Sequence, residues 1–322
     1  MHVRFGYVAM SVNVANASPS KTMTATQFEK LADREAALRK LERLAMENLH
    51  NTLRLLRHNR AYDIHVFRFS SKLVPLATHP ITEGWDPFPR LSESFRELGE
   101  YALRNGMRTS FHPDHFTVLT TPREEVLRVS LLDLAHQVRM LEAMGLGAES
   151  KCNIHIGGTY GNKETALERF RSRFVELPDS IRNRLTLEND DKTYTALETL
   201  RFAEEIGVPM VLDLHHHQVN PGDGEAAAEL WPRIQATWNG TGLPPKIHVS
   251  SPKNEKDIRA HADFVEPAPL VSFLRSIASQ TPALDIMIEA KQKDSALFRL
   301  MKDLEGMDGF RTTDGASVEV NG

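Results

Sequence analysis

Residues 185–213, LTLENDDKTYTALETLRFAEEIGVPMVLD, contain one complete strand–helix–strand unit. The apolar runs at 185–188 and 209–213 predict buried strands. Between them, residues 195–206 repeat apolar side chains at helical spacing, and Gly207 supplies the residue that commonly ends a helix. A unit of this kind is typical of a parallel sheet whose strands are covered by helices.

The same alternation continues on both sides of this unit. Further strands are predicted at 3–8, 64–69, 107–111, 152–156, 246–250 and 285–289. Helical periodicity marks segments 28–57, 91–104, 123–144, 164–176, 225–236, 269–279 and 295–304. The pattern predicts an α/β fold, a single-domain (β/α)8 TIM barrel with long βα loops over residues 1–305, with an open doubly wound sheet as the structural alternative. The polar, Gly-rich segment 306–322 is expected to be a flexible C-terminal tail.

Composition narrows the class of protein. A chain of 322 residues that is 41% hydrophobic has enough apolar material for a barrel-sized core. A net charge of −4 argues weakly against a generic nucleic-acid binder, unless the acidic groups surround bound cations. The single cysteine, Cys152, excludes an intrachain disulfide and a Cys-based zinc site, and indicates a reducing, cytoplasmic setting. No apolar run is long enough to span a membrane.

Potential metal ligands follow consecutive predicted strands at their carboxyl ends. They are His112, His155, Glu188, Asp213, His248 and Glu289. These ends meet on one rim of a barrel, so the side chains are expected to converge there. Burying Glu188 or Glu289 without a partner would cost several kcal/mol, which favours a bound cation. With the loop histidines added, the set is large enough for two or three divalent ions, an arrangement used in phosphodiester hydrolysis.

The stretch VLDLHHHQVNPG does not determine which of its histidines is a metal ligand. Strand alternation would pair Asp213 with His215, whereas His216 could fold back from the loop. Spacing alone does not decide between the two histidines, and His217 is expected to face elsewhere.

Taken in order, the motifs resemble the UV damage endonuclease family of endonuclease IV and xylose isomerase-like TIM barrels. The matching pieces are FGY, KLVPLATHP, SFHPDHF, IHIGGTYGNK, LENDDKTY, VLDLHHHQVNPG, KIHVSSPK, RAHADF and MIEAKQKD, and they extend from residue 5 to residue 294. The resemblance implies a metal-dependent DNA repair enzyme. Such an enzyme nicks double-stranded DNA immediately 5′ of cyclobutane pyrimidine dimers and 6-4 photoproducts.

The resemblance also implies a site with three divalent ions, commonly Mn²⁺, with Zn²⁺ or Mg²⁺ as alternatives. The implied ligands are His112, His155, Glu188, Asp213, His216, His248, His261 and Glu289. The resemblance therefore selects His216 over His215. Lys246 matches a lysine that can be carboxylated in the family.

Three further roles are carried over from the family. His79 matches a histidine near the scissile phosphate, and Tyr7 matches an active-site tyrosine. His115 and Phe116 occupy the positions of a side-chain pair that is inserted into the duplex, which is Gln-Tyr in some members. An aromatic ring is retained here, but its hydrogen-bonding neighbour differs.

Two other activities fit the same ligands: an abasic-site endonuclease of the endonuclease IV type, and a metal-dependent sugar isomerase. Lysines in the loops that follow the strands favour phosphate contacts over a sugar. A non-enzymatic metal-storage or DNA-binding module is disfavoured, because ligands on a barrel rim leave coordination positions open.

Overall fold

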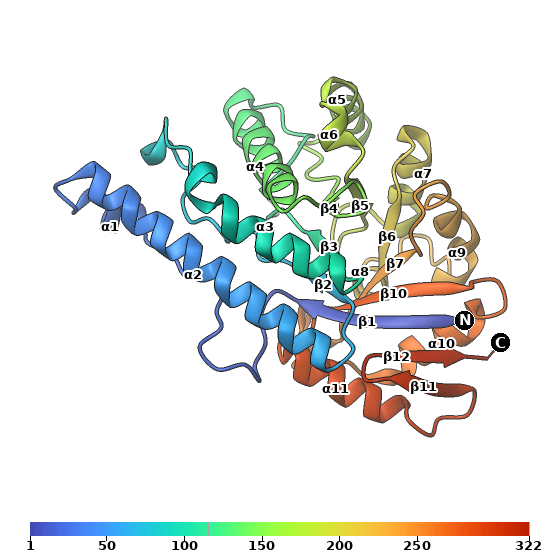
Figure 1. Ribbon diagram of the computed structural model, residues 1–322. Helices are drawn as coiled ribbons and strands as arrows, with labels where there is room; N and C mark the ends of the chain where they lie inside the picture. The colour runs from blue at the N-terminus through green and yellow to red at the C-terminus, as the bar shows by residue number, and fades with distance from the viewer. Residues whose placement is uncertain (115, 322) are drawn as a thin grey trace.

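In residues 1–114 and 116–321, which the computed structural model describes, eight parallel strands close into a barrel (Figure 1). They are β1 (His2–Val8), β2 (Val66–Arg68), β3 (Arg108–Phe111), β4 (Lys151–His155), β5 (Leu185–Glu188), β6 (Met210–Asp213), β7 (Lys246–Val249) and β10 (Ala283–Ile288). β10 pairs with β1 from His2↔Ala283 to Tyr7↔Ile288, which closes the sheet and excludes the open-sheet alternative. Each predicted run overlaps one of these strands, so the predicted TIM barrel is confirmed.

Helices follow the strands and cover the outside of the barrel (Figure 1). The main ones are α2 (Arg34–Ala61), α3 (Phe88–Arg104), α4 (Glu124–Ala143), α5 (Lys163–Glu176), α7 (Ala196–Ile206), α9 (Ala227–Ala236), α10 (Pro267–Ile277) and α11 (Lys293–Leu304). Shorter helical segments are α1 (Ala25–Glu29), η1 (Pro80–Thr82), α6 (Asp179–Arg182) and α8 (Leu214–Val219). α7 illustrates how the sequence sets both ends of a helix. Thr195 and Glu198 form a capping box at its start, and Gly207 ends it with a φ of 68°. No helix in the described ranges has the length and apolar character needed to cross a bilayer.

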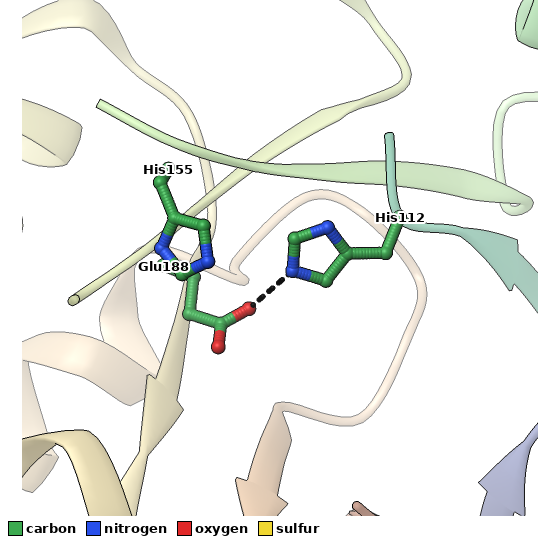
Figure 2. Close-up of side chains that lie close together, drawn as sticks. All are labelled: His112, His155 and Glu188. Carbon is green, nitrogen blue, oxygen red and sulfur yellow. Dashed lines mark hydrogen bonds and ion pairs between the residues drawn. The ribbon is translucent and has the colours of Figure 1, made fainter. Parts of the chain in front are cut away.

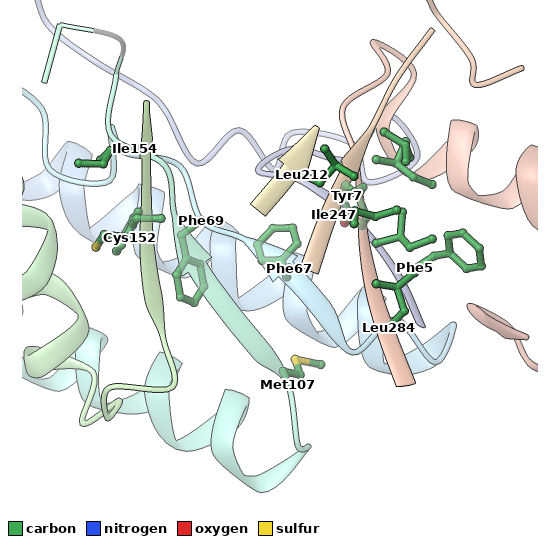
Figure 3. Close-up of a cluster of buried hydrophobic side chains, with 14 of the residues drawn as sticks. Phe5, Tyr7, Phe67, Phe69, Met107, Cys152, Ile154, Leu212, Ile247 and Leu284 are labelled. Atoms are coloured by element: carbon green, nitrogen blue, oxygen red, sulfur yellow. The ribbon is translucent and has the colours of Figure 1, made fainter. Parts of the chain in front are cut away.

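Side-chain alternation along the strands separates an apolar layer from a polar interior. Phe67 and Tyr7 are register partners that face the helices, as do Leu212 and Ile247, and all four are buried (Figure 3). Side chains of the opposite parity point into the barrel. They include charged groups rather than the bulky aliphatic residues usual in such barrels.

The deeper part of this interior holds a buried ion-pair network. Asp285 accepts hydrogen bonds from Arg4 Nε and Nη2, both at 2.7 Å, and from Arg108 Nη1 at 2.6 Å. Beside it, Lys246 Nζ lies 3.2 Å from Ser110 Oγ. Lys246 belongs to this layer because it precedes His248 by two strand positions.

The C-terminal segment differs from the expected flexible tail. β11 (Phe310–Asp314) and β12 (Ser317–Val320) form a hairpin, and β12 pairs antiparallel with β1. Val318 and Val320 alternate with polar residues and are almost fully buried. The alternation covers only the four residues of β12, so it is hard to recognise in a Gly-rich segment. In the structure, β12 lies against the first residues of β1. The ordered domain therefore extends past residue 305.

Candidate metal centre

The predicted strand-end ligands converge on one rim of the barrel. Among the described residues, two groups have ligand atoms that all lie within 4.8 Å of one another. The first group is His112, His155 and Glu188, and the second is Glu188, Asp213, His248 and Glu289. Figure 2 shows His112, which follows β3, and His155, the last residue of β4, close to the Glu188 side chain. Glu188 is thus shared by both groups.

Glu188 is the centre of the cluster and is only 1% exposed. Its Oε2 lies 3.2 Å from His112 Nε2 and 3.0 Å from His248 Nδ1. Asn153 donates a hydrogen bond to the same oxygen and fixes the carboxylate from below. Burial by itself raises the pKa of Glu188, but the charges of His248 and His155 outweigh it and hold the pKa well below its ordinary value. The carboxylate is therefore ionised and available to a cation.

Buried polar atoms that form no hydrogen bond support the fit of the cluster to metal ions. Within the described part of the chain, Glu188 Oε1, Asp213 Oδ2 and His155 Nδ1 are buried and make no hydrogen bond. Leaving such atoms unsatisfied costs about 1–3 kcal/mol each. Carboxylate oxygens and imidazole nitrogens that converge in this way are the donors divalent transition metals accept. The residues present therefore fit divalent ions on either side of Glu188.

Two further predicted ligands, His216 and His261, lie outside both groups. Asp213 caps α8, and its Oδ1 accepts a hydrogen bond from His216 N at 2.7 Å. His216 Nδ1 lies 2.9 Å from the Asn189 carbonyl, an arrangement in which the other ring nitrogen, Nε2, could bind a metal. His261 Nδ1 is similarly placed 2.8 Å from the Glu289 carbonyl. The His216 and His261 rings are 6.5 Å apart.

His215 has a different position, which sequence reasoning did not anticipate. Its Nε2 lies 2.6 Å from the Ile258 carbonyl, and its Nδ1 lies 2.7 Å from Ser250 Oγ. Ile258 belongs to β9 (Asp257–His261), which pairs with β8 (Pro252–Asn254) in the hairpin that carries His261. His215 therefore ties this hairpin to the barrel, and both of its ring nitrogens are engaged.

Arg68 is a second residue that sequence reasoning missed. Its Nη1 lies 2.6 Å from Glu289 Oε1, and its side chain is almost fully buried inside the barrel. Arg68 could have been identified only from its position on the barrel-facing side of β2, and that position requires the strand pairing to be known. Lys246 lies one layer below His248 and outside both ligand groups. Burial first, and Arg108 next, hold the pKa of Lys246 well below its usual value.

The structure does not bring Tyr7 to the cluster. The side chain is fully buried, and its hydroxyl donates to Asn59 Oδ1 of α2 at 2.7 Å. The ring packs edge-on against Phe67, 5.3 Å away. Strand alternation places Tyr7 on the helix-facing side of β1, whereas the predicted ligands lie on the side that faces into the barrel.

The loop candidates lie at the rim. His79 is exposed and caps η1, where its Nδ1 accepts a hydrogen bond from Ile81 N at 3.1 Å. The hollow beside the ligands has a volume of about 380 Å³ and is lined by other residues, including Lys72, His112 and His155. Phe116, in the loop after β3, is 71% exposed. His115 lies outside the described residues.

Two histidine pKa values predict how the metal-free protein responds to pH. Burial lowers the pKa of His216 and of His248, but nearby carboxylates outweigh burial and raise both from 6.5 to about 9. Asp213 and Glu188 act on His216, and Glu188 and Glu289 act on His248. Protonation of these rings stabilises the fold fully below about pH 6.5, and this contribution is lost as pH rises through about 9.

The thermal midpoint of the EDTA-treated protein should therefore decrease as the pH rises from about 6.5 to about 9. Saturating Mn²⁺ should reduce or reverse the fall, because ions replace the protons and bind more tightly as the rings deprotonate. Differential scanning fluorimetry from pH 6 to pH 9.5 measures both curves, with His216→Gln flattening part of the metal-free slope. A thermal midpoint of the metal-free protein that rises over this range would contradict the raised pKa values of His216 and His248.

Comparison with known proteins agrees with this geometry. Residues 3–321 match the family model described as UV-endonuclease UvdE. The UV DNA damage endonuclease of Halalkalibacterium halodurans is 48% identical over 322 residues, covering 100% of both chains. That of Bacillus pumilus is 44% identical over 319 residues, covering 99% of each.

Solved structures extend the comparison to the fold. The crystal structure of SacUVDE superimposes with a TM-score of 0.83 at 28% identity, covering 95% of this chain and 99% of that one. Endonuclease IV from Thermus thermophilus has a TM-score of 0.53 at 14% identity, covering 93% of this chain and 98% of that one, which shows a shared fold. With the barrel, the rim cluster and these matches together, the chain belongs to the UV-endonuclease UvdE family.

Proposed function

We propose that this protein is a metal-dependent endonuclease that nicks double-stranded DNA immediately 5′ of UV photoproducts. The substrates would be cyclobutane pyrimidine dimers and 6-4 photoproducts, and the nick would initiate excision repair. The observation that carries the proposal is the Glu188 carboxylate shared by two ligand groups at the barrel rim. One carboxylate between two groups is what closely spaced ions in phosphodiester hydrolysis require. Two relatives that match this chain over 100% and 99% of their own length are named UV DNA damage endonuclease.

The proposed cofactor is a set of three divalent ions, with Mn²⁺ as the expected metal. When bound, such ions would lower the pKa of a water molecule and neutralise charge on the scissile phosphate. The protein's part is to hold the ligands still. Asn153 fixes Glu188, Arg68 orients Glu289, and the Asn189 carbonyl orients His216. Groups that orient ligands in this way commonly change metal affinity by about 10- to 100-fold.

Lys246 is proposed to carry a carboxyl group. A neutral amine can attack CO₂ through nitrogen, lose one proton to solvent and become a carbamate anion. The depressed pKa of Lys246 supplies the neutral amine. Arg68 and Arg108 lie near enough to influence the lysine and would stabilise the resulting negative charge. Mass spectrometry of the intact protein in bicarbonate, compared with Lys246→Gln, tests this step.

The loop residues are proposed to bind DNA. The exposed position of His79 supports contact with a phosphate beside the cleaved bond. Exposure of Phe116 supports insertion into the base stack, where an apolar wedge fills the space left by a poorly stacked lesion. The packing of Tyr7 between Phe67 and Asn59 supports a role in holding β1 against α2.

The deciding experiment uses an end-labelled duplex with one thymine dimer, incubated with EDTA-treated protein with and without Mn²⁺. The expected product is a nick one bond 5′ of the dimer that appears only with the metal. An undamaged duplex and a duplex with one abasic site are run in parallel. Nicking of the abasic duplex alone would instead assign an endonuclease IV-type activity. A separate incubation with a ketose and Mn²⁺ tests the other alternative, because interconversion of the ketose without nicking of any duplex would assign a sugar isomerase.

A further inference from the structure

A second hollow lies on the same rim, apart from the metal ligands. Its volume is about 660 Å³, and it lies between the loop after β3, the first turns of α4 and the loop after β4. Phe116, Val129 and Tyr160 line it and are 71%, 45% and 44% exposed. Exposed aromatic and aliphatic groups gathered around one hollow are characteristic of a binding surface. The proposed nicking reaction uses Phe116 as a wedge but gives no role to Tyr160, Arg123 or Arg128.

The chain connects this hollow directly to the metal centre. Phe116 follows the ligand His112 by four residues, and Tyr160 follows the ligand His155 by five. His112 directly follows β3, His155 is the last residue of β4, and these two strands pair with each other. The hollow is therefore built from the same two loops that follow the candidate ligands His112 and His155.

The backbone around Tyr160 is specialised to present its ring. Tyr160 has a φ of 50°, a left-handed conformation that is uncommon for an aromatic residue. Gly157 and Gly161, at φ 111° and 92°, supply the flexibility on either side. A Cβ on Gly158 would approach the Tyr160 ring to 3.3 Å, so the ring lies close over that glycine. Unfavourable conformations of this kind concentrate at ligand-binding sites.

Charge identifies the class of ligand. Arg123 and Arg128 line the hollow and are exposed, and within the described ranges neither guanidinium forms an ion pair. Glu125 is the one acidic side chain among the lining residues. The Arg169 guanidinium lies 5.8 Å from the Tyr160 ring centroid. Arginines beside aromatic rings are the combination that binds nucleic acid: cations pair with phosphates, and rings stack with bases.

A neighbouring hollow extends this surface. It has a volume of about 510 Å³, shares Arg128 and Val129 with the first, and continues to Trp85 and His79 in the loop after β2. The two hollows therefore share two lining residues, and together they involve the loops after β2, β3 and β4. A surface spread over three loops suits a DNA strand better than a compact small molecule.

We propose that the hollow lined by Phe116 and Tyr160 is a nucleobase-binding site that takes up an unstacked base of the damaged duplex, with Tyr160 as its stacking surface. The inference rests on the proposed function and adds a specific contact to it. Arg123 and Arg128 contact the phosphates that flank this base. The site contributes to binding of damaged DNA and not to breaking the phosphodiester bond.

The test compares Tyr160→Ala with Tyr160→Phe and Tyr160→Trp. Fluorescence anisotropy in EDTA gives the Kd for a duplex with one thymine dimer and for an undamaged duplex. Tyr160→Ala should raise the Kd for the damaged duplex by about tenfold or more, while the two aromatic variants retain binding. The metal content of all three variants should stay unchanged, because Tyr160 belongs to neither group of candidate metal ligands. Tyr62→Ala removes a tyrosine of similar exposure, 48%, that follows α2 and serves as control.

A second pair of variants tests the electrostatic part. Arg128→Gln should weaken DNA binding and reduce the slope of log Kd against log salt by about one, whereas Glu125→Gln should strengthen binding. An unchanged Kd in Tyr160→Ala, with wild-type protein binding and nicking the damaged duplex, overturns the inference and leaves the proposed function standing. Wild-type protein that neither prefers nor nicks the damaged duplex contradicts the proposed function itself.

Discussion

Glu188→Gln is expected to reduce nicking of a thymine-dimer duplex by about 10³-fold, with the fold intact. Glu188 belongs to both ligand groups, so its neutralisation weakens cation binding on both sides at once. Charge stabilisation by bound ions is worth several kcal/mol in the transition state, and about 4 kcal/mol corresponds to this factor. Single-turnover nicking at saturating Mn²⁺ measures the loss, and elemental analysis measures the ions retained.

A second readout separates this effect from general damage to the site. The Glu188 carboxylate is the first of the groups that raise the pKa of His248 against burial. Glu188→Gln should therefore lower that pKa in the metal-free protein, which NMR titration of the imidazole resolves. Glu142→Gln, on the exposed surface of α4, is the matched control and should change neither quantity. Full nicking activity in Glu188→Gln with normal ion content would remove Glu188 from the mechanism.

The fold and the core of the site could be predicted because both follow from strand periodicity. Apolar runs separated by helical segments give the barrel, and the last residue of a run lies at its rim. Glu188 and Asp213 are the final residues of β5 and β6, so their positions follow from the run itself. The two carboxylates meet because neighbouring parallel strands end side by side.

The choice between His215 and His216 required the structure. Alternation favours His215 only if the strand continues past Asp213. Instead α8 begins at once, and the helical step returns the third residue, His216, to the Asp213 carboxylate. A helix of six residues has too little sequence for periodicity to reveal it.

The sequence also does not reveal which face of each strand points into the barrel. The sequence of β1 gives alternating faces but does not say which face points inward. Pairing with β2 decides it and turns Tyr7 toward α2. The same register turns Arg68 inward onto Glu289, although its run, IHVFRF, looks like an ordinary strand with one surface cation.

Asp285→Ala is expected to lower the free energy of unfolding by about 3–5 kcal/mol, the cost of breaking a buried ion pair from one side. Asp285 is fully buried and bonds both Arg4 and Arg108. Without it, the Arg108 guanidinium, also buried, would face Lys246 and Arg4 with no compensating charge. Urea unfolding at pH 7 measures the change. Asp303→Ala removes a partner of Arg299 that is 33% exposed, and it should cost less than about 1 kcal/mol.

Acidification provides an independent check on the same network. Burial raises the pKa of Asp285, but Arg108 and Arg4 outweigh it and lower the pKa below 3.8. The charge of Asp285 therefore stabilises the fold above the unfolded pKa, and this contribution is lost as pH falls through the lower folded value. Asp285→Asn keeps the side-chain shape and loses the charge, so its deficit relative to the wild type should shrink between pH 5 and pH 3. A deficit that stays constant over that range would mean that the side-chain shape stabilises this layer and that the charge of Asp285 does not.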